Sequence, residues 1–102
     1  MTRKEFRVAI VGATGLVGQE FIKVLGQRNF PMGSLHLFAS DRSAGRKITV
    51  NNEETEVRET TPQSFEGIDI ALFSAGSEIS QHFSPIAARA GAVVIDNSAA
   101  FR

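Results

Sequence analysis

The stretch that decides the fold is Phe6–Gly18, which reads F-R-V-A-I-V-G-A-T-G-L-V-G. Its first half contains Val8, Ile10 and Val11, an apolar run that is typical of a central parallel strand covered on both faces. Three glycines then follow at three-residue intervals, and a segment with helical spacing comes after them. The stretch therefore predicts a buried strand that runs through a glycine-rich turn into a helix.

Each of the three glycines has an expected role. Gly12 and Gly15 lack a Cβ, so they allow a sharp turn and bring backbone N–H groups within reach of a bulky anion. Gly18 allows the new helix to lie close against the strand. Because the start of a helix adds unpaired N–H donors and a positive dipole end, the turn favours a pyrophosphate. The motif thus points to a dinucleotide.

Two alternatives remain open at this turn. Its spacing is G-x-x-G-x-x-G rather than the common G-x-G-x-x-G, and a glycine-rich turn without a ligand has the same composition. Thr14 favours the ligand, because its hydroxyl can donate to a phosphate oxygen. The same hydroxyl can cap the helix, and the two roles are compatible.

Length and composition set the limits for the rest of the chain. With 102 residues and 42% hydrophobic content, it is at most one small globular domain, and not necessarily a complete one. Eleven basic residues balance eleven acidic ones, so neither nucleic acid nor an anionic membrane is an expected partner. No apolar stretch is long enough to span a bilayer, and residues 1–5 do not resemble a signal peptide. We therefore expect a cytoplasmic protein.

No metal site is expected. The chain has no cysteine, which excludes disulfides and thiolate zinc sites within it. Its two histidines lie far apart in the sequence. His36 is expected in a strand on a polar face, and His82 is expected on the solvent side of a helix.

Apolar spacing predicts the remaining elements. A helix is expected over residues 16–28, and buried strands over 35–39, 68–73 and 92–96. A solvent-exposed β-hairpin is expected from the alternating segments 47–50 and 55–58. The buried face of the first helix is predicted to hold Val17, Phe21, Val24 and Leu25.

Proline and glycine mark two further helical segments. Thr61-Pro62 predicts a single helical turn that runs through Phe65. A second helix is expected from Ile79, Phe83, Ile86, Ala87 and Ala90, and Gly91 closes it. Because Pro85 falls inside this helix, we expect either a kink or a restart with Ser84 as the N-cap.

This order of elements predicts an α/β fold, a Rossmann-like, doubly wound and mostly parallel sheet with an inserted β-hairpin. The ligand of such a sheet lies across the carboxyl ends of its strands. The loop after the second strand contains Ser40, Asp41, Arg42 and Ser43. A guanidinium beside hydroxyls suits a 2′-phosphate, whereas Asp41 leaves room for NAD, and a solvated turn is the third alternative.

Two later loops follow predicted strands. Ser74-Ala75-Gly76 is small enough for a ribose or nicotinamide to lie on the backbone, and it is equally compatible with a simple tight turn. Asp96-Asn97-Ser98 is ambiguous in the same way. Without further context, Arg102 is interpreted as a surface charge.

Taken together, the sequence resembles the amino-terminal part of the aspartate-β-semialdehyde dehydrogenases. The resemblance covers the chain end to end. It rests on V-A-I-V-G-A-T-G-L-V-G-Q-E-F (8–21), R-N-F-P (28–31), A-S-D-R-S-A-G (39–45), F-S-A-G (73–76) and A-G-A-V-V-I-D-N-S-A-A-F-R (90–102). The acyl-phosphate reductases of arginine synthesis share the fold and chemistry, but their motifs differ more from these.

The resemblance implies an enzyme of lysine, threonine and methionine biosynthesis that reduces L-aspartyl 4-phosphate to the semialdehyde, with NADPH as hydride donor and release of phosphate. Residues 1–102 would be an incomplete amino-terminal NADP-binding domain of a homodimeric parent. The family's catalytic cysteine and histidine lie beyond residue 102, so the fragment is expected to be inactive.

The resemblance also implies roles for particular residues. Thr14, Gly15, Leu16 and Val17 would contact the pyrophosphate, Arg42 and Ser43 would contact the 2′-phosphate, and Arg102 would bind the phosphoryl group that leaves the substrate. The wider set of expected cofactor residues adds Gly12, Ser40, Ser74 and Gly76.

A non-catalytic NADP-binding sensor with the same glycine turn is the alternative function. Such a sensor has no reason to carry D-N-S-A-A-F-R after the last strand. Short-chain reductases also share the turn, but they need a tyrosine–lysine pair; residues 1–102 contain no tyrosine, so in such a protein the tyrosine would lie downstream.

Overall fold

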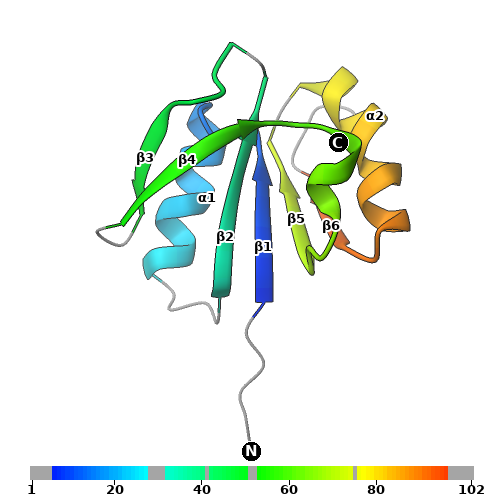
Figure 1. Cartoon of the computed structure of the whole chain (residues 1–102), viewed down its shortest axis with the longest axis horizontal. Coiled ribbons are helices and arrows are strands. Elements are labelled where there is room, and N and C mark those ends of the chain that lie inside the picture. Colours follow the sequence, from blue (N-terminus) through cyan, green and yellow to red (C-terminus); the bar gives the residue numbers. More distant parts are fainter. Residues whose placement is uncertain (1–5, 28–31, 41, 51–52, 75, 97–102) are drawn as a thin grey trace, which may run out of the picture.

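The computed structural model describes residues 6–27, 32–40, 42–50, 53–74 and 76–96. Within these ranges six strands form one sheet in the order β3-β4-β2-β1-β5-β6 (Figure 1). The strands are β1 (Phe6–Val11), β2 (Met32–Ala39), β3 (Lys47–Val50), β4 (Glu53–Glu59), β5 (Ile70–Phe73) and β6 (Val93–Asp96). The helical elements are α1 (Leu16–Gln27), the short 3-10 helix η1 (Pro62–Phe65) and α2 (Ser77–Arg89).

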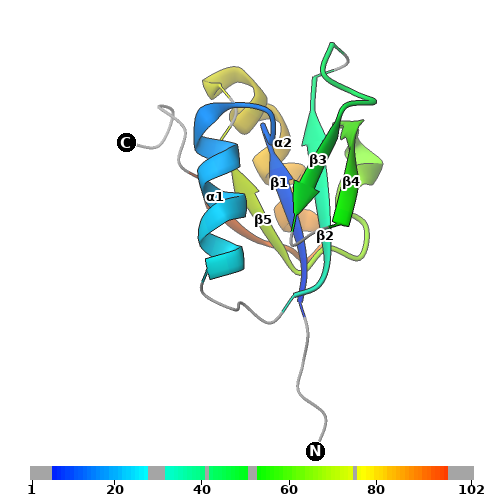
Figure 2. The same cartoon turned by 90° about the vertical axis from the view of Figure 1, so that its left-hand side faces the viewer.

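The predicted fold class is confirmed. Strands β4, β2, β1, β5 and β6 run parallel, and β3 alone is antiparallel, to β4. Figure 2 shows α1 on one side of the sheet and η1 on the other. Phe83 and Ala87 of α2 pack in the same core cluster as Phe65 of η1, so α2 covers the η1 side. Helices on both faces make the sheet doubly wound.

The hairpin is present and one of its faces is exposed as expected, but its other face is buried against the core. Strand β4 pairs in parallel with β2, and Val57, opposite Leu37, is fully buried. Ile48 and Val50 of β3 join the core cluster beneath α1. The hairpin therefore extends the sheet at the place where a plain dinucleotide-binding fold has a second crossover helix, because its alternate apolar residues fit the face that α1 covers.

The predicted buried face of α1 is confirmed for Phe21 and Leu25, which pack against the core, and was wrong for Val17 and Val24. Val17 and Val24 are 39% and 40% exposed, whereas Gly18 and Ile22 face the sheet. The reason is steric. A Cβ built on Gly18 would lie only 2.2 Å from the carbonyl oxygen of Gly12, so this side of the helix is the one that approaches the turn most closely. The role predicted for Gly18 is thus confirmed.

Helix α2 continues through Pro85, so the predicted restart with Ser84 as N-cap was wrong. The Ser84 hydroxyl instead donates to Asp96 (3.4 Å), as does the buried hydroxyl of Ser80 (3.3 Å). Pro85 is exposed, where water can satisfy the carbonyl that proline leaves without a donor. The predicted closure at Gly91 is confirmed by its φ of +99°.

The predicted turn after Thr61 is also confirmed, as η1. The backbone N–H of Thr61 donates to the hydroxyl of Ser64 (2.8 Å), and Phe65 at the end of the turn is fully buried.

Val93 and Ile95 of β6 lie on the α1 side of the sheet and are 61% and 50% exposed. No helix among the described residues is long and apolar enough to cross a membrane.

Candidate functional site

The glycine turn joins β1 to α1 at the carboxyl end of the sheet. Gly12 has a φ of +89°, which favours glycine, and its N–H donates to the carbonyl of Phe38 in β2 (2.8 Å). The N–H of Ala13 donates to the same carbonyl (3.1 Å), and the N–H of Gly15 donates to Gly12 (3.1 Å). These three donors hold the turn itself, so they are not the ones available to an anion.

The available donors lie at the start of α1. The first hydrogen bond of the helix runs from the N–H of Gln19 to the carbonyl of Gly15 (3.0 Å). The N–H groups of Leu16 and Val17 therefore precede the hydrogen-bonded ladder, and within the described ranges they donate to no other residue. Both residues are exposed, and the positive end of the helix dipole lies here. An anion at this position would meet unpaired donors.

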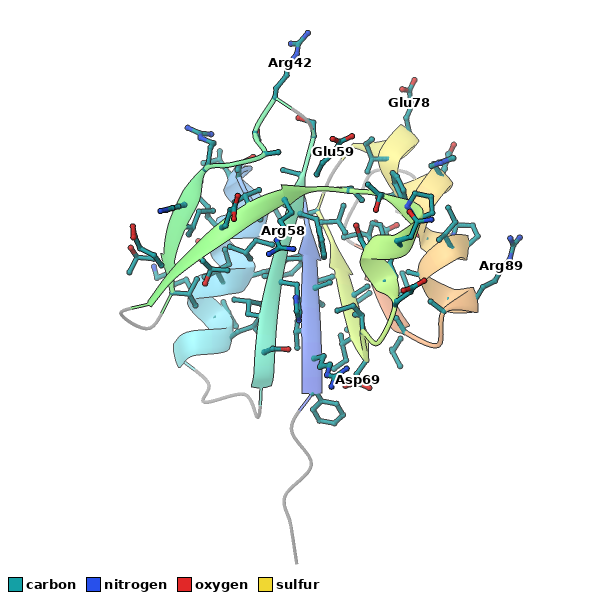
Figure 3. The ribbon with its side chains drawn as sticks, viewed as in Figure 1. Arg42, Arg58, Glu59, Asp69, Glu78 and Arg89 are labelled. Carbon is teal, nitrogen blue, oxygen red and sulfur yellow. The ribbon has the colours of Figure 1, made fainter. Side chains whose placement is uncertain are left out.

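Thr14 connects the glycine turn to the loop after β2. Its hydroxyl donates to the hydroxyl of Ser43 (3.3 Å), so the expected pyrophosphate and 2′-phosphate residues are in direct contact. The loop is closed by hydrogen bonds from the N–H groups of Ser43 and Ala44 to the carbonyl of Ser40 (3.0 and 3.1 Å). Arg42 is exposed at the tip of this loop and points away from the sheet (Figure 3). Asp41 lies outside the described residues.

Ser74 supports the turn from the neighbouring strand. Its N–H donates to the carbonyl of Val11 (2.9 Å), and its hydroxyl lies 3.1 Å from that carbonyl and 3.2 Å from the carbonyl of Gly12. The hydroxyl therefore fixes the glycine turn in this structure. Gly76 precedes α2, is exposed and has open space where a Cβ would be. Ala75 lies outside the described residues, as do Asn97, Ser98 and Arg102.

A cavity of about 360 Å³ opens between these loops and α2. It contains three of the predicted cofactor residues, Gly12, Thr14 and Ser40. Its lining comprises Val11, Gly12, Thr14, Ala39, Ser40, Glu59, Thr60, Ile79 and Phe83. The cavity thus lies at the carboxyl ends of β1, β2 and β4, where ligands of parallel sheets bind.

The other six lining residues were not among the predicted site residues: Val11, Ala39, Glu59, Thr60, Ile79 and Phe83. Glu59 ends β4 and Thr60 follows it, and this strand was interpreted as half of an exposed hairpin rather than as a strand that pairs in parallel with β2. In the sequence, Glu59 and Thr60 directly follow the alternating segment 55–58, and this position could have indicated that they lie at the carboxyl end of a strand. Thr60 is fixed by two hydrogen bonds to the carbonyl of Ala39, one from its N–H (3.0 Å) and one from its hydroxyl (3.2 Å).

A larger cavity of about 600 Å³ lies along β2 and β4 on the η1 side of the sheet and includes His36 and Arg58. Burial lowers the pKa of His36, and the positive charges of Arg7 and Arg58 lower this pKa further. The Ser34 hydroxyl lies 2.9 Å from Nε2 of His36, on the same strand face. This agrees with the polar strand face expected for His36, and His82 is exposed on α2 as expected. The described residues contain no cluster of metal ligands.

Three features of the described residues fit a nucleotide cofactor. Unpaired N–H donors begin α1, hydroxyls of Thr14 and Ser43 lie beside them, and a partly apolar cavity follows along the strand ends. The predicted residues Gly15, Leu16 and Val17 lie at the helix start, and Ser74 lies behind the turn. The exposed side chain of Arg42 points away from the sheet.

Comparison with known proteins gives a consistent result. The family model described as the NAD binding domain of semialdehyde dehydrogenases matches residues 7–102. The aspartate-semialdehyde dehydrogenase of Bacillus subtilis is 56% identical over 95 residues, which are 93% of this chain and 28% of that protein. The chain therefore spans less than a third of the length of this relative.

Two solved structures extend the comparison. The aspartate semialdehyde dehydrogenase II of Vibrio cholerae, crystallised with ASA, is 44% identical with a TM-score of 0.87, over 96% of this chain and 32% of that one. The enzyme of Candida albicans, crystallised with NADP, is 25% identical with a TM-score of 0.77, over 96% of this chain and 31% of that one.

Proposed function

This chain belongs to the family of semialdehyde dehydrogenase NAD-binding domains, and from this premise we propose that it is the NADP-binding part of an aspartate-semialdehyde dehydrogenase. The whole enzyme would reduce L-aspartyl 4-phosphate to the semialdehyde and release phosphate. The observation that carries the proposal is the row of unpaired N–H groups at Leu16 and Val17, beside the Thr14–Ser43 contact and the cavity.

The residues present would divide the cofactor between them. The N–H groups of Leu16 and Val17 and the hydroxyl of Thr14 would bind the pyrophosphate. Ser43 and Arg42 would bind the 2′-phosphate, with the exposed Arg42 side chain folding back onto it. When bound, the dinucleotide supplies a hydride to the acyl carbon.

The rest of the reaction would use residues of the parent protein outside this chain. The chain has no cysteine, so it cannot supply the thiol that takes up the acyl group, and we expect no turnover by the chain alone. Arg102 would bind the departing phosphoryl group through its planar guanidinium. We further propose a cytoplasmic, homodimeric parent that acts on small molecules.

The preference for NADPH over NADH tests the cofactor assignment. A charge-assisted hydrogen bond from Arg42 to the 2′-phosphate corresponds to about ten- to a hundredfold in affinity. Both reduced cofactors are titrated against the wild type, Arg42→Ala and Arg46→Ala, the last being a matched loss of an exposed arginine that follows the same loop. We expect Arg42→Ala alone to remove the preference. Equal affinities in the wild type, or equal losses in both variants, would contradict the assignment.

A further inference from the structure

Glu59 is a carboxylate at the mouth of the cavity that has no assigned role. It ends β4 and lies opposite Ala39 in the parallel pairing with β2. Within the described ranges its side chain has no hydrogen-bond or ion-pair partner, and it is exposed. Figure 3 shows it beside the end of β2, with Arg42 pointing away from it. A carboxylate placed in a ligand cavity without a partner in the protein is available to the ligand.

The strand order indicates which part of a dinucleotide would reach it. The turn after β1 holds the pyrophosphate donors, the loop after β2 holds Ser40 and Ser43, and β4 is the next strand outward. A dinucleotide that extends from β1 across β2 therefore presents its base, beyond phosphates and ribose, near the end of β4. The cavity there has an apolar wall formed by Ile79 and Phe83 of α2. A flat base suits such a wall.

The carboxylate of Glu59 limits which groups on a base it can bind. An ionised carboxylate only accepts hydrogen bonds, so it needs an N–H or O–H donor on the ligand. The exocyclic amino group of adenine is such a donor, whereas a 6-oxo purine presents an acceptor at the same position. A 2′-phosphate would be repelled by the carboxylate, which argues against the ribose as its partner when NADP is bound.

We propose that Glu59 determines base specificity, by accepting a hydrogen bond from the 6-amino group of the adenine. The inference rests on the proposed function, since the ligand is the dinucleotide assigned to this cavity. It assigns to the end of β4 a recognition role that complements the phosphate contacts of β1 and β2.

The test compares NADPH with its reduced hypoxanthine analogue, which differs at the 6-position. The chain has neither tryptophan nor tyrosine, so the fluorescence of the reduced nicotinamide reports binding with little protein background. Wild type, Glu59→Gln and Glu78→Gln are titrated with both ligands, after circular dichroism confirms that each is folded. Glu78 is an exposed carboxylate in the first turn of α2 that does not line the cavity.

We expect the wild type and Glu78→Gln to bind NADPH at least about tenfold more tightly than the analogue, as expected for one charge-assisted hydrogen bond. Glu59→Gln should bind both ligands within about twofold of each other, because an amide can present either a donor or an acceptor. NADPH binding with a base preference that Glu59→Gln leaves intact, or with none in the wild type, overturns the inference and leaves the proposed function standing. No NADPH binding by the folded wild type overturns both.

Discussion

Replacing Gly18 by alanine tests how α1 is held against the glycine turn. The new Cβ would lie 2.2 Å from the carbonyl oxygen of Gly12 and 2.9 Å from Cα of Ala13. Cβ contacts below 3.0 Å are essentially never observed, so the helix start must retreat by about 0.8 Å, from 2.2 to 3.0 Å, or the turn must deform. All of these neighbours are backbone atoms, which cannot rotate away as a side chain would.

The expected cost follows from two opposing effects. Overpacking at a rigid contact costs about 1–3 kcal/mol, and a backbone clash this close belongs at the upper end of that range. The higher helix propensity of alanine returns up to about 1 kcal/mol. We therefore expect Gly18→Ala to lower the free energy of unfolding by about 2 kcal/mol. For a chain of this length that corresponds to a fall in Tm of roughly 8–16 °C.

Thermal melts followed by circular dichroism measure this, with Gly15→Ala and Gly76→Ala as controls. A Cβ on Gly15 would make an ordinary 3.5 Å contact, and a Cβ on Gly76 would meet nothing within 4 Å. Both controls should therefore melt close to the wild type. A Gly18→Ala variant that is as stable as the controls would refute the steric argument for this helix position.

Two further predictions concern the rest of the sheet. The lowered pKa of His36 means that the unfolded chain takes up its proton at higher pH than the folded one, so stability should be complete above the ordinary pKa of 6.5 and fall as the pH drops below it. Urea titrations across this pH range measure the free energy of unfolding. The loss of this free energy at acid pH should be smaller in His36→Gln than in the wild type and unchanged in His82→Gln. Identical pH profiles for all three proteins would show that His36 does not cause the loss. The half-exposed Ile95 on β6 leaves apolar surface uncovered, so the chain should self-associate at high concentration. Sedimentation velocity should show less self-association for Ile95→Thr than for the wild type. A wild type that stays monomeric at high concentration would contradict this prediction.

The parts of the fold predicted from sequence are those that depend on local pattern. The apolar run of β1, the glycine turn and the closure of α2 at Gly91 each follow from backbone requirements that only a few residue types meet. The covered face of α1 was predicted only in part, because Val17 and Ile22 have similar hydrophobicity and only Ile22 is buried. What distinguishes them is the close approach at Gly18, a contact between segments that periodicity alone does not show.

The contact between the glycine turn and the loop after β2 agrees with the sequence prediction, whereas the residues at the end of β4 were not predicted. Thr14 and Ser43, expected at neighbouring phosphates, lie within hydrogen-bond distance. Glu59 and Thr60 were missed because the alternating pattern of β4 is the same for a hairpin strand and for a strand paired with β2. Which partner a strand takes is decided by long-range packing, here by Val57 entering the core opposite Leu37.

The central claim is that a dinucleotide binds with its pyrophosphate at the start of α1. The most direct measurement is a titration of the isotopically labelled chain with NADPH, followed through assigned backbone amide resonances. The account predicts that the amide chemical shifts of Leu16 and Val17 change most, and that those of Thr14 and Thr60 change with the same apparent Kd. The amide resonance of Gly67, at the opposite end of the sheet, should not shift. Shifts centred on the His36 cavity, or no saturable change at Leu16 and Val17, would contradict it.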